Sequence, residues 1–179
     1  MARLDEPAGE EDLLQPLVPR PVEPRVVGPR ALRAIWWAGF SSGVLDITAA
    51  FLVYGFFGAK PIALLQGIAA GVLGPSARQG GLRTACLGLF LHFVIAFGAA
   101  SVYFVASRWI SFLTQHAGKA GILYGIAVYF FMNRIVVPLS AARKSPFSAK
   151  MMVIGVVIHV FCVGLPIAFS IRKYANPRE

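Results

Sequence analysis

Hydrophobic and polar positions divide the chain into a polar beginning and four long apolar segments. The apolar segments cover about residues 32–57, 82–106, 120–139 and 149–171. Each one reaches the roughly twenty residues that a helix needs to cross the hydrocarbon core of a bilayer. An open sheet would leave backbone groups unpaired in lipid, so the four segments are predicted to be helices. The sequence therefore predicts an all-α integral membrane protein, with a four-helix transmembrane bundle over residues 31–174.

A fifth apolar segment, residues 61–74, reads PIALLQGIAAGVLG and is too short to cross a bilayer. Pro61 suits the first position of a helix, and Gly74 followed by proline suits its end. A short interfacial or re-entrant helix is expected here. Glycines let helices approach closely in membranes. The residues expected to pack this helix against a neighbour are Gln66, Gly67 and Gly71.

Residues 1–30 differ from the rest of the chain, because they hold six of the twelve prolines and six of the eight acidic residues. Such a composition buries too little apolar surface to build a core. This part is predicted to be a disordered, Pro-rich tail.

Composition narrows the class of protein further. The chain has 179 residues, 57% of them hydrophobic and 14% charged, and a mean hydropathy of +0.68. Soluble domains carry roughly a quarter charged residues, so this chain is much more apolar than a typical soluble domain. The net charge of +9 does not indicate nucleic-acid binding, since the basic residues lie near the ends of the apolar segments and not in one stripe. That placement predicts a lipid bilayer as the main partner, with the chain itself or another membrane protein as further candidates.

Basic residues also predict an orientation. If the N-terminus is cytoplasmic, the cytoplasmic side carries Arg20, Arg25, Arg30, Arg33, Arg108, Lys119, Arg172, Lys173 and Arg178. The opposite side carries Lys60, Arg78, Arg83, Arg143, Lys144 and Lys150. Cytoplasmic loops are enriched in Lys and Arg, so nine against six favours a multi-pass protein with both termini in the cytoplasm.

Polar residues inside the apolar segments are the candidate site. Asp46 is the only carboxylate side chain between Glu23 and Glu179, and a charge within the membrane is costly and usually functional. Each segment has a stripe of small residues that includes a polar one, and small residues mark where membrane helices meet. The stripes are Gly39, Gly43, Asp46 and Ala50; Gly88, His92, Ala96 and Ala99; Gly121, Gly125, Tyr129 and Asn133; and Gly155, His159, Cys162 and Pro166.

The stripes predict a buried polar cluster near the middle of the membrane. Its candidate members are Asp46, His92, Asn133, Arg134 and His159. Four interpretations are open. In the first, the cluster fixes helix packing in a structural, accessory or partner-binding protein. In the second, it serves a small-solute or proton-coupled transporter through Asp46 and the histidines. In the third, His92 and His159 bind haem b or a metal. In the fourth, Asp46 and a histidine act as acid and base in an enzyme, although no catalytic motif is present.

Several segments resemble a group of small, four-span bacterial inner-membrane proteins. They are GVLDITAAF (43–51), LLQGIAAGVLG (64–74), LGLFLHFVIAFGAA (87–100), YGIAVYFFMN (124–133) and VVPLS (136–140). The resemblance covers roughly residues 35–171. It implies a bacterial cytoplasmic (inner) membrane and no particular activity. Recurring Asp, Gln and His positions of that group correspond to Asp46, Gln66 and His92.

Overall fold

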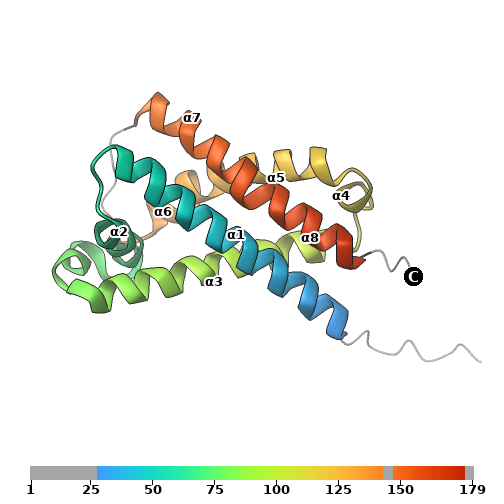
Figure 1. Cartoon of the computed structure of the whole chain (residues 1–179), viewed down its shortest axis with the longest axis horizontal. Helices are drawn as coiled ribbons and strands as arrows, with labels where there is room; N and C mark the ends of the chain where they lie inside the picture. Colours follow the sequence, from blue (N-terminus) through green and yellow to red (C-terminus); the bar gives the residue numbers. More distant parts are fainter. Residues whose placement is uncertain (1–27, 143–146, 176–179) are drawn as a thin grey trace, which may run out of the picture.

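The structure is a computed structural model that describes residues 28–142 and 147–175, and these residues form an all-helical bundle (Figure 1). Four helical stretches are long and apolar enough to cross a membrane: Pro29–Phe56, Gly81–Ser107, Ala117–Leu139 and Ala149–Tyr174. The predicted fold class, four membrane helices and one shorter helix, is confirmed. Of the predicted tail over residues 1–30, positions 1–27 lie outside the described residues.

The described part of the chain begins with α1 (Pro29–Phe56), the short α2 (Pro61–Leu73), η2 (Gly74–Gln79) and α3 (Gly81–Ser107). The short helix α4 (Phe112–Gln115) precedes the third membrane helix, which consists of α5 (Ala117–Phe131), η3 (Met132–Val136) and α6 (Val137–Leu139). The fourth consists of α7 (Ala149–Ile158), η4 (His159–Gly164) and α8 (Leu165–Ala175).

The helix ends follow local chemistry. Proline occupies a first-turn position in α1 and α2, where its missing N–H costs nothing. Gly74 ends α2 with φ +69°, a conformation that glycine adopts without strain. The Ser148 hydroxyl caps α7 by accepting a bond from the backbone N–H of Met151.

The third and fourth membrane helices each contain a π-helical segment, η3 and η4. A proline follows each segment in the sequence, Pro138 after η3 and Pro166 after η4. Proline lacks an N–H and its ring clashes with the carbonyl four residues earlier, at Arg134 and Cys162 respectively. A wider helical turn relieves this clash, so the two prolines account for the two π-helical segments.

Two separate groups of buried side chains hold the bundle together. In the larger group α1 packs against α3 and α8, and α8 also packs against α5. Its buried members are Ala34, Ala38, Ala100, Tyr103, Ala117, Ala120, Val163, Ile167, Ala168 and Ile171. The smaller group lies under α2 and η2 at the other end of the bundle, and its buried members are Ala69, Ala70 and Ala77. The bundle is therefore closely packed at both ends.

Glycine allows two pairs of elements to approach until their backbones touch. On α3, a Cβ added at Gly88 would overlap the backbone carbonyl of Leu65 in α2. On α5, a Cβ at Gly125 would lie 2.6 Å from the carbonyl oxygen of His159. A Cβ at Gly164 of η4 would overlap the carbonyl of Gly121 in α5. Van der Waals contact of this kind is the main attraction between membrane helices.

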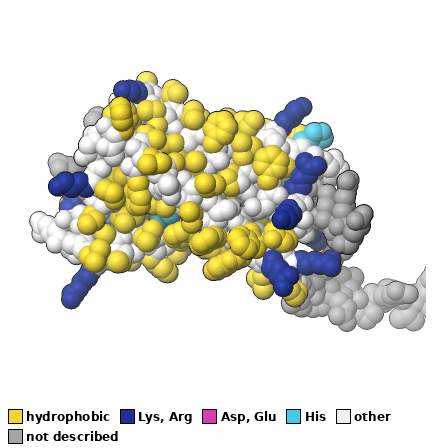
Figure 2. Space-filling view, in the orientation of Figure 1, with side chains coloured by type: hydrophobic (Ala, Val, Ile, Leu, Met, Phe, Trp, Pro, Cys, Tyr) yellow, Lys and Arg dark blue, Asp and Glu magenta, His cyan; other side chains and the backbone are white. Residues whose placement is uncertain are grey.

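The surface agrees with a membrane location. In Figure 2, Lys and Arg side chains gather towards both ends of the long axis, and hydrophobic side chains cover the middle. Trp36 and Trp109 are 58% and 79% exposed near helix ends, as expected for rings at the membrane interface.

A glycine substitution tests the contact between α2 and α3. Gly88→Ala should lower the free energy of unfolding by about 1–3 kcal/mol, because the new methyl group meets the backbone of Leu65 and neither helix can yield easily. The measurement is the melting temperature of the purified protein in detergent.

Gly98 offers a matched control on the same helix, because no atom lies within 4 Å of a Cβ placed there. Gly98→Ala should leave the melting temperature unchanged or raise it, since alanine is the better helix former by about 1 kcal/mol. Equal melting temperatures for the two variants would contradict the contact.

Candidate functional site

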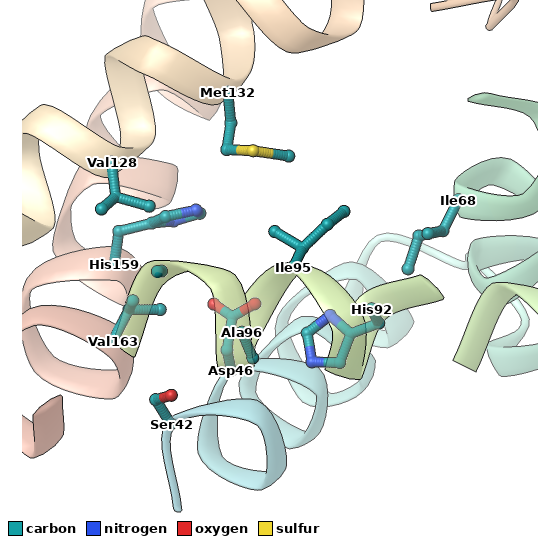
Figure 3. A pocket seen from close by; sticks show the side chains of 11 residues that line it. Ser42, Asp46, Ile68, His92, Ile95, Ala96, Val128, Met132, His159 and Val163 are labelled. Atoms are coloured by element: carbon teal, nitrogen blue, oxygen red, sulfur yellow. The ribbon is translucent and has the colours of Figure 1, made fainter. Parts of the chain in front are cut away.

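A cavity of about 200 Å³ lies between the membrane helices. Figure 3 shows the side chains that surround it, among them Asp46 from α1, His92 from α3 and His159 from η4. The full lining is Ser42, Asp46, Ile68, His92, Ile95, Ala96, Ala99, Val128, Met132, His159 and Val163. Three of the five predicted polar residues thus share one cavity.

The cavity lies near the middle of the membrane. At 1.5 Å per residue, its lining residues on the four membrane helices fall within roughly 8 Å of the helix midpoints. The larger buried group packs towards one end of the bundle and the smaller group, under α2, towards the other. The cavity lies between these two buried groups, where the helices are less closely packed.

Asp46 brings the only acidic side chain to this cavity among the described residues. It is half-buried and stands one helical turn after the buried Ser42, so both side chains face the same way. No hydrogen bond or ion pair joins its carboxylate to another described residue, and no buried polar side-chain atom of the described chain lacks a partner. The carboxylate therefore retains accessible surface, and this surface faces the cavity.

The two histidines each use one ring nitrogen to donate to a backbone carbonyl. His92 Nε2 lies 2.8 Å from the Gly43 oxygen and so links α3 to α1. His159 Nδ1 lies 2.9 Å from the Gly155 oxygen, one turn earlier, and its ring meets Tyr129 edge-on at 5.4 Å. In a neutral imidazole the second nitrogen is an acceptor. Each neutral ring thus retains one acceptor, His92 Nδ1 and His159 Nε2.

Hydrogen bonds join the surrounding elements on two sides of the space. On one side the Tyr124 hydroxyl donates to the Ala99 carbonyl at 2.7 Å and so joins α5 to α3, with Tyr103 packed edge-on against Tyr124. On the other side the Ala141 N–H donates to the Gly71 carbonyl at 2.9 Å and joins the chain after α6 to α2. From α2, Ile68 reaches the cavity.

The predicted buried polar cluster is not formed. Asn133 and Arg134 are exposed and do not line the cavity, and Asn133 donates to the carbonyl of Tyr129 on its own helix. The remaining three predicted residues are half-buried, with no hydrogen bond between their side chains. Arg134 therefore does not pair with Asp46.

Helix geometry explains why Asn133 was misplaced. The stripe of the third segment advances in steps of four residues, from Gly121 to Asn133. At 3.6 residues per turn, each step of four turns the side chain about 40° further around the helix. After three steps the drift is about 120°, which takes Asn133 away from the face of Gly121. The other stripes contain steps of three, which reverse the drift.

The residues expected to pack the short helix have different environments. Gln66 is buried, and its Nε2 donates to the Gly81 carbonyl at 3.0 Å, which fixes α2 to the start of α3. A Cβ at Gly67 would meet nothing within 4 Å, and one at Gly71 would make ordinary contact with Ser140. The glycine with the closest contact between α2 and α3 is Gly88, on α3.

Sequence reasoning missed several cavity residues, chiefly Ser42, Ile68 and Met132. Ser42 could have been found from its position four residues before Asp46 on the same helical face. Pro138 and Pro166 inside apolar segments are a signal for the π-helical segments, which begin at the cavity residues Met132 and His159. Apolar lining residues carry no such signal.

A haem between His92 and His159 does not fit this site. The Nε2 of His92 carries its hydrogen towards the Gly43 carbonyl, so that nitrogen has no lone pair for iron. The cavity of about 200 Å³ is also smaller than the roughly 300–1,000 Å³ typical of sites for cofactors and drug-sized ligands. Among the described residues, no three His, Cys, Asp or Glu side chains lie close enough to hold a metal ion.

Comparisons of the chain with protein-family models, with curated proteins and with solved structures give no match. The findings define a multi-pass membrane protein by its four membrane helices, and no family is identified.

The link between α3 and α5 can be tested at Tyr124. Tyr124→Phe removes the hydroxyl that bonds to Ala99 and should lower the free energy of unfolding by about 0.6–1.7 kcal/mol, the range for hydrogen bonds between membrane helices. Denaturation of the protein in mixed micelles measures the loss.

The control is Tyr129→Phe on the same helix, because no hydrogen bond of the Tyr129 hydroxyl to a described residue is present. This variant should keep wild-type stability. A Tyr124→Phe variant as stable as the Tyr129→Phe variant would show that the hydroxyl does not join the helices.

Proposed function

We propose that this protein binds a small monovalent cation at Asp46 in the central cavity and carries it across the membrane. The observation that carries the proposal is the Asp46 carboxylate, which faces a cavity near the middle of the bilayer without an ion pair or hydrogen bond to the described residues. This corresponds to the transport interpretation of the sequence. It assigns the cation to the carboxylate, with His92 and His159 as neighbouring acceptors.

Electrostatics supports this proposal over a purely structural role for Asp46. Moving a charged group out of water costs several kcal/mol even after the protein relaxes, unless the charge finds a partner. Residues that only fix packing have such partners, whereas acids on ion pathways face a cavity. A bound cation would supply the missing opposite charge.

The histidines favour a second role, in packing. The bond from His92 to the Gly43 carbonyl joins two membrane helices, which is what a structural, accessory or partner-binding membrane protein requires. In our proposal this bond holds the cavity open beside Asp46. The structural role of the histidine and the binding role of the carboxylate are thus compatible.

The bacterial inner membrane is the proposed location, with both termini in the cytoplasm. The end of the bundle where α1 begins and α8 ends carries Arg30, Arg33, Arg108, Lys119, Arg172 and Lys173, all of them exposed. An excess of Lys and Arg on short cytoplasmic segments supports this orientation.

Substitution of Asp46 separates binding from packing. Asp46→Asn keeps the shape of the side chain and removes its charge, so the melting temperature in detergent should stay the same or rise, because no ion pair is lost. The melting temperature of the wild type and the variant is measured in the same detergent. A fall of several degrees would mean that Asp46 has a structural partner and would overturn the proposal.

Transport is tested with purified protein in sealed vesicles. Wild-type protein should take up radiolabelled methylammonium with saturation, and Asp46→Asn should abolish this uptake. Arg134→Gln is the matched control, because it removes a charge from the same membrane domain at a residue outside the cavity, and it should retain wild-type uptake. Equal uptake by wild type and Asp46→Asn would contradict the role of the carboxylate.

A further inference from the structure

We propose that the ligand of this cavity is a small organic ammonium with an apolar group. This inference rests on the proposed cation site at Asp46 and adds the chemical class of the ligand. The lining residues and the volume of the cavity support it.

The lining offers few oxygen ligands. Asp46 supplies a carboxylate, and Ser42 supplies a hydroxyl that already donates to the Gly39 carbonyl at 3.2 Å. Protein sites for inorganic cations surround the ion with several oxygens, often rings of backbone carbonyls, that replace its water shell. The cavity lacks such a set among its lining residues, so a bare metal cation would lose more hydration than it regains.

An organic ammonium matches the rest of the lining. Its N–H groups can donate to the Asp46 carboxylate and to the acceptor nitrogens that remain on the neutral histidines. Its carbon part would lie against the apolar wall, which is made of Ile68, Ile95, Ala96, Ala99, Val128, Met132 and Val163. The wall outnumbers the polar groups, which favours a ligand that is partly apolar.

The size of the cavity limits the ligand. A volume of about 200 Å³ corresponds to roughly six or seven water molecules at about 30 Å³ each. A short-chain alkylammonium occupies such a space, and a drug-sized molecule does not. The ligand is therefore expected to carry only a few carbon atoms.

A homologous series of ligands tests the class. The probes are ammonium, methylammonium, ethylammonium, propylammonium and butylammonium chlorides, with potassium chloride as the inorganic cation. Binding stabilises the folded state, so the half-saturating concentration is obtained from the rise in melting temperature in detergent. Affinity should increase roughly fourfold for each methylene group added until the cavity is filled, the factor expected for burying one CH₂.

Three outcomes are distinguishable. Increasing affinity along the series, absent from Asp46→Asn, supports both the site and the ligand class. Binding of potassium and ammonium that Asp46→Asn abolishes, with no dependence on chain length, keeps the cation site and overturns the organic ligand. No stabilisation of the wild type by any probe, or equal stabilisation of Asp46→Asn, overturns both.

A pair of substitutions in the apolar wall gives a second readout. Ile95→Ala removes part of the wall and should reduce the affinity for butylammonium at least fivefold while leaving that for ammonium unchanged. Val94→Ala is the control, because Val94 is 50% exposed on the same helix and does not line the cavity. Equal effects of the two substitutions would show that the wall does not hold the carbon chain.

Discussion

Backbone contact at glycine is the interaction on which the bundle depends. Lipid tails are as apolar as leucine, so burial from water does not draw these helices together within the membrane. Their attraction comes from close packing, and one place where two backbones touch is where Gly121 and Gly125 of α5 meet η4. That contact fixes His159, whose backbone lies against Gly125, and with it one wall of the cavity. A second contact, between Gly88 and α2, fixes the opposite wall.

The fold was predictable because the bilayer reduces the choices. A segment of about twenty mostly apolar residues has one stable form in lipid, a helix that crosses it, even where it contains a single charged residue such as Asp46. The short α2 was also predictable, from Pro61 at its beginning and Gly74 at its end. The packing partner of α2 was not, because the glycine that allows it, Gly88, belongs to α3 and looks no different in sequence from the glycines that make no contact.

The candidate site was predictable only in part. Asp46, His92 and His159 line one cavity, as their depth and their stripes of small residues suggested. The stripe through Asn133 failed because steps of four residues drift around a helix, and Arg134 lies beside it on the outer face. Depth along a helix follows from counting residues, whereas direction around it requires the true twist. The cavity itself, an absence of side chains, leaves no direct trace in sequence.

The two π-helical segments have a consequence for how the chain is built. A π-helical turn contains about one residue more than an α-helical turn, so η3 and η4 each behave like a one-residue insertion inside an otherwise regular helix. The added residue shifts the phase of everything that follows by about 100°. As a result, the face of α8 that packs against α1 and α5 differs from the face that an uninterrupted α-helix continuing from α7 would place there. A chain one residue shorter in η4 would keep the same four helices and lose the alignment that leaves space beside Asp46.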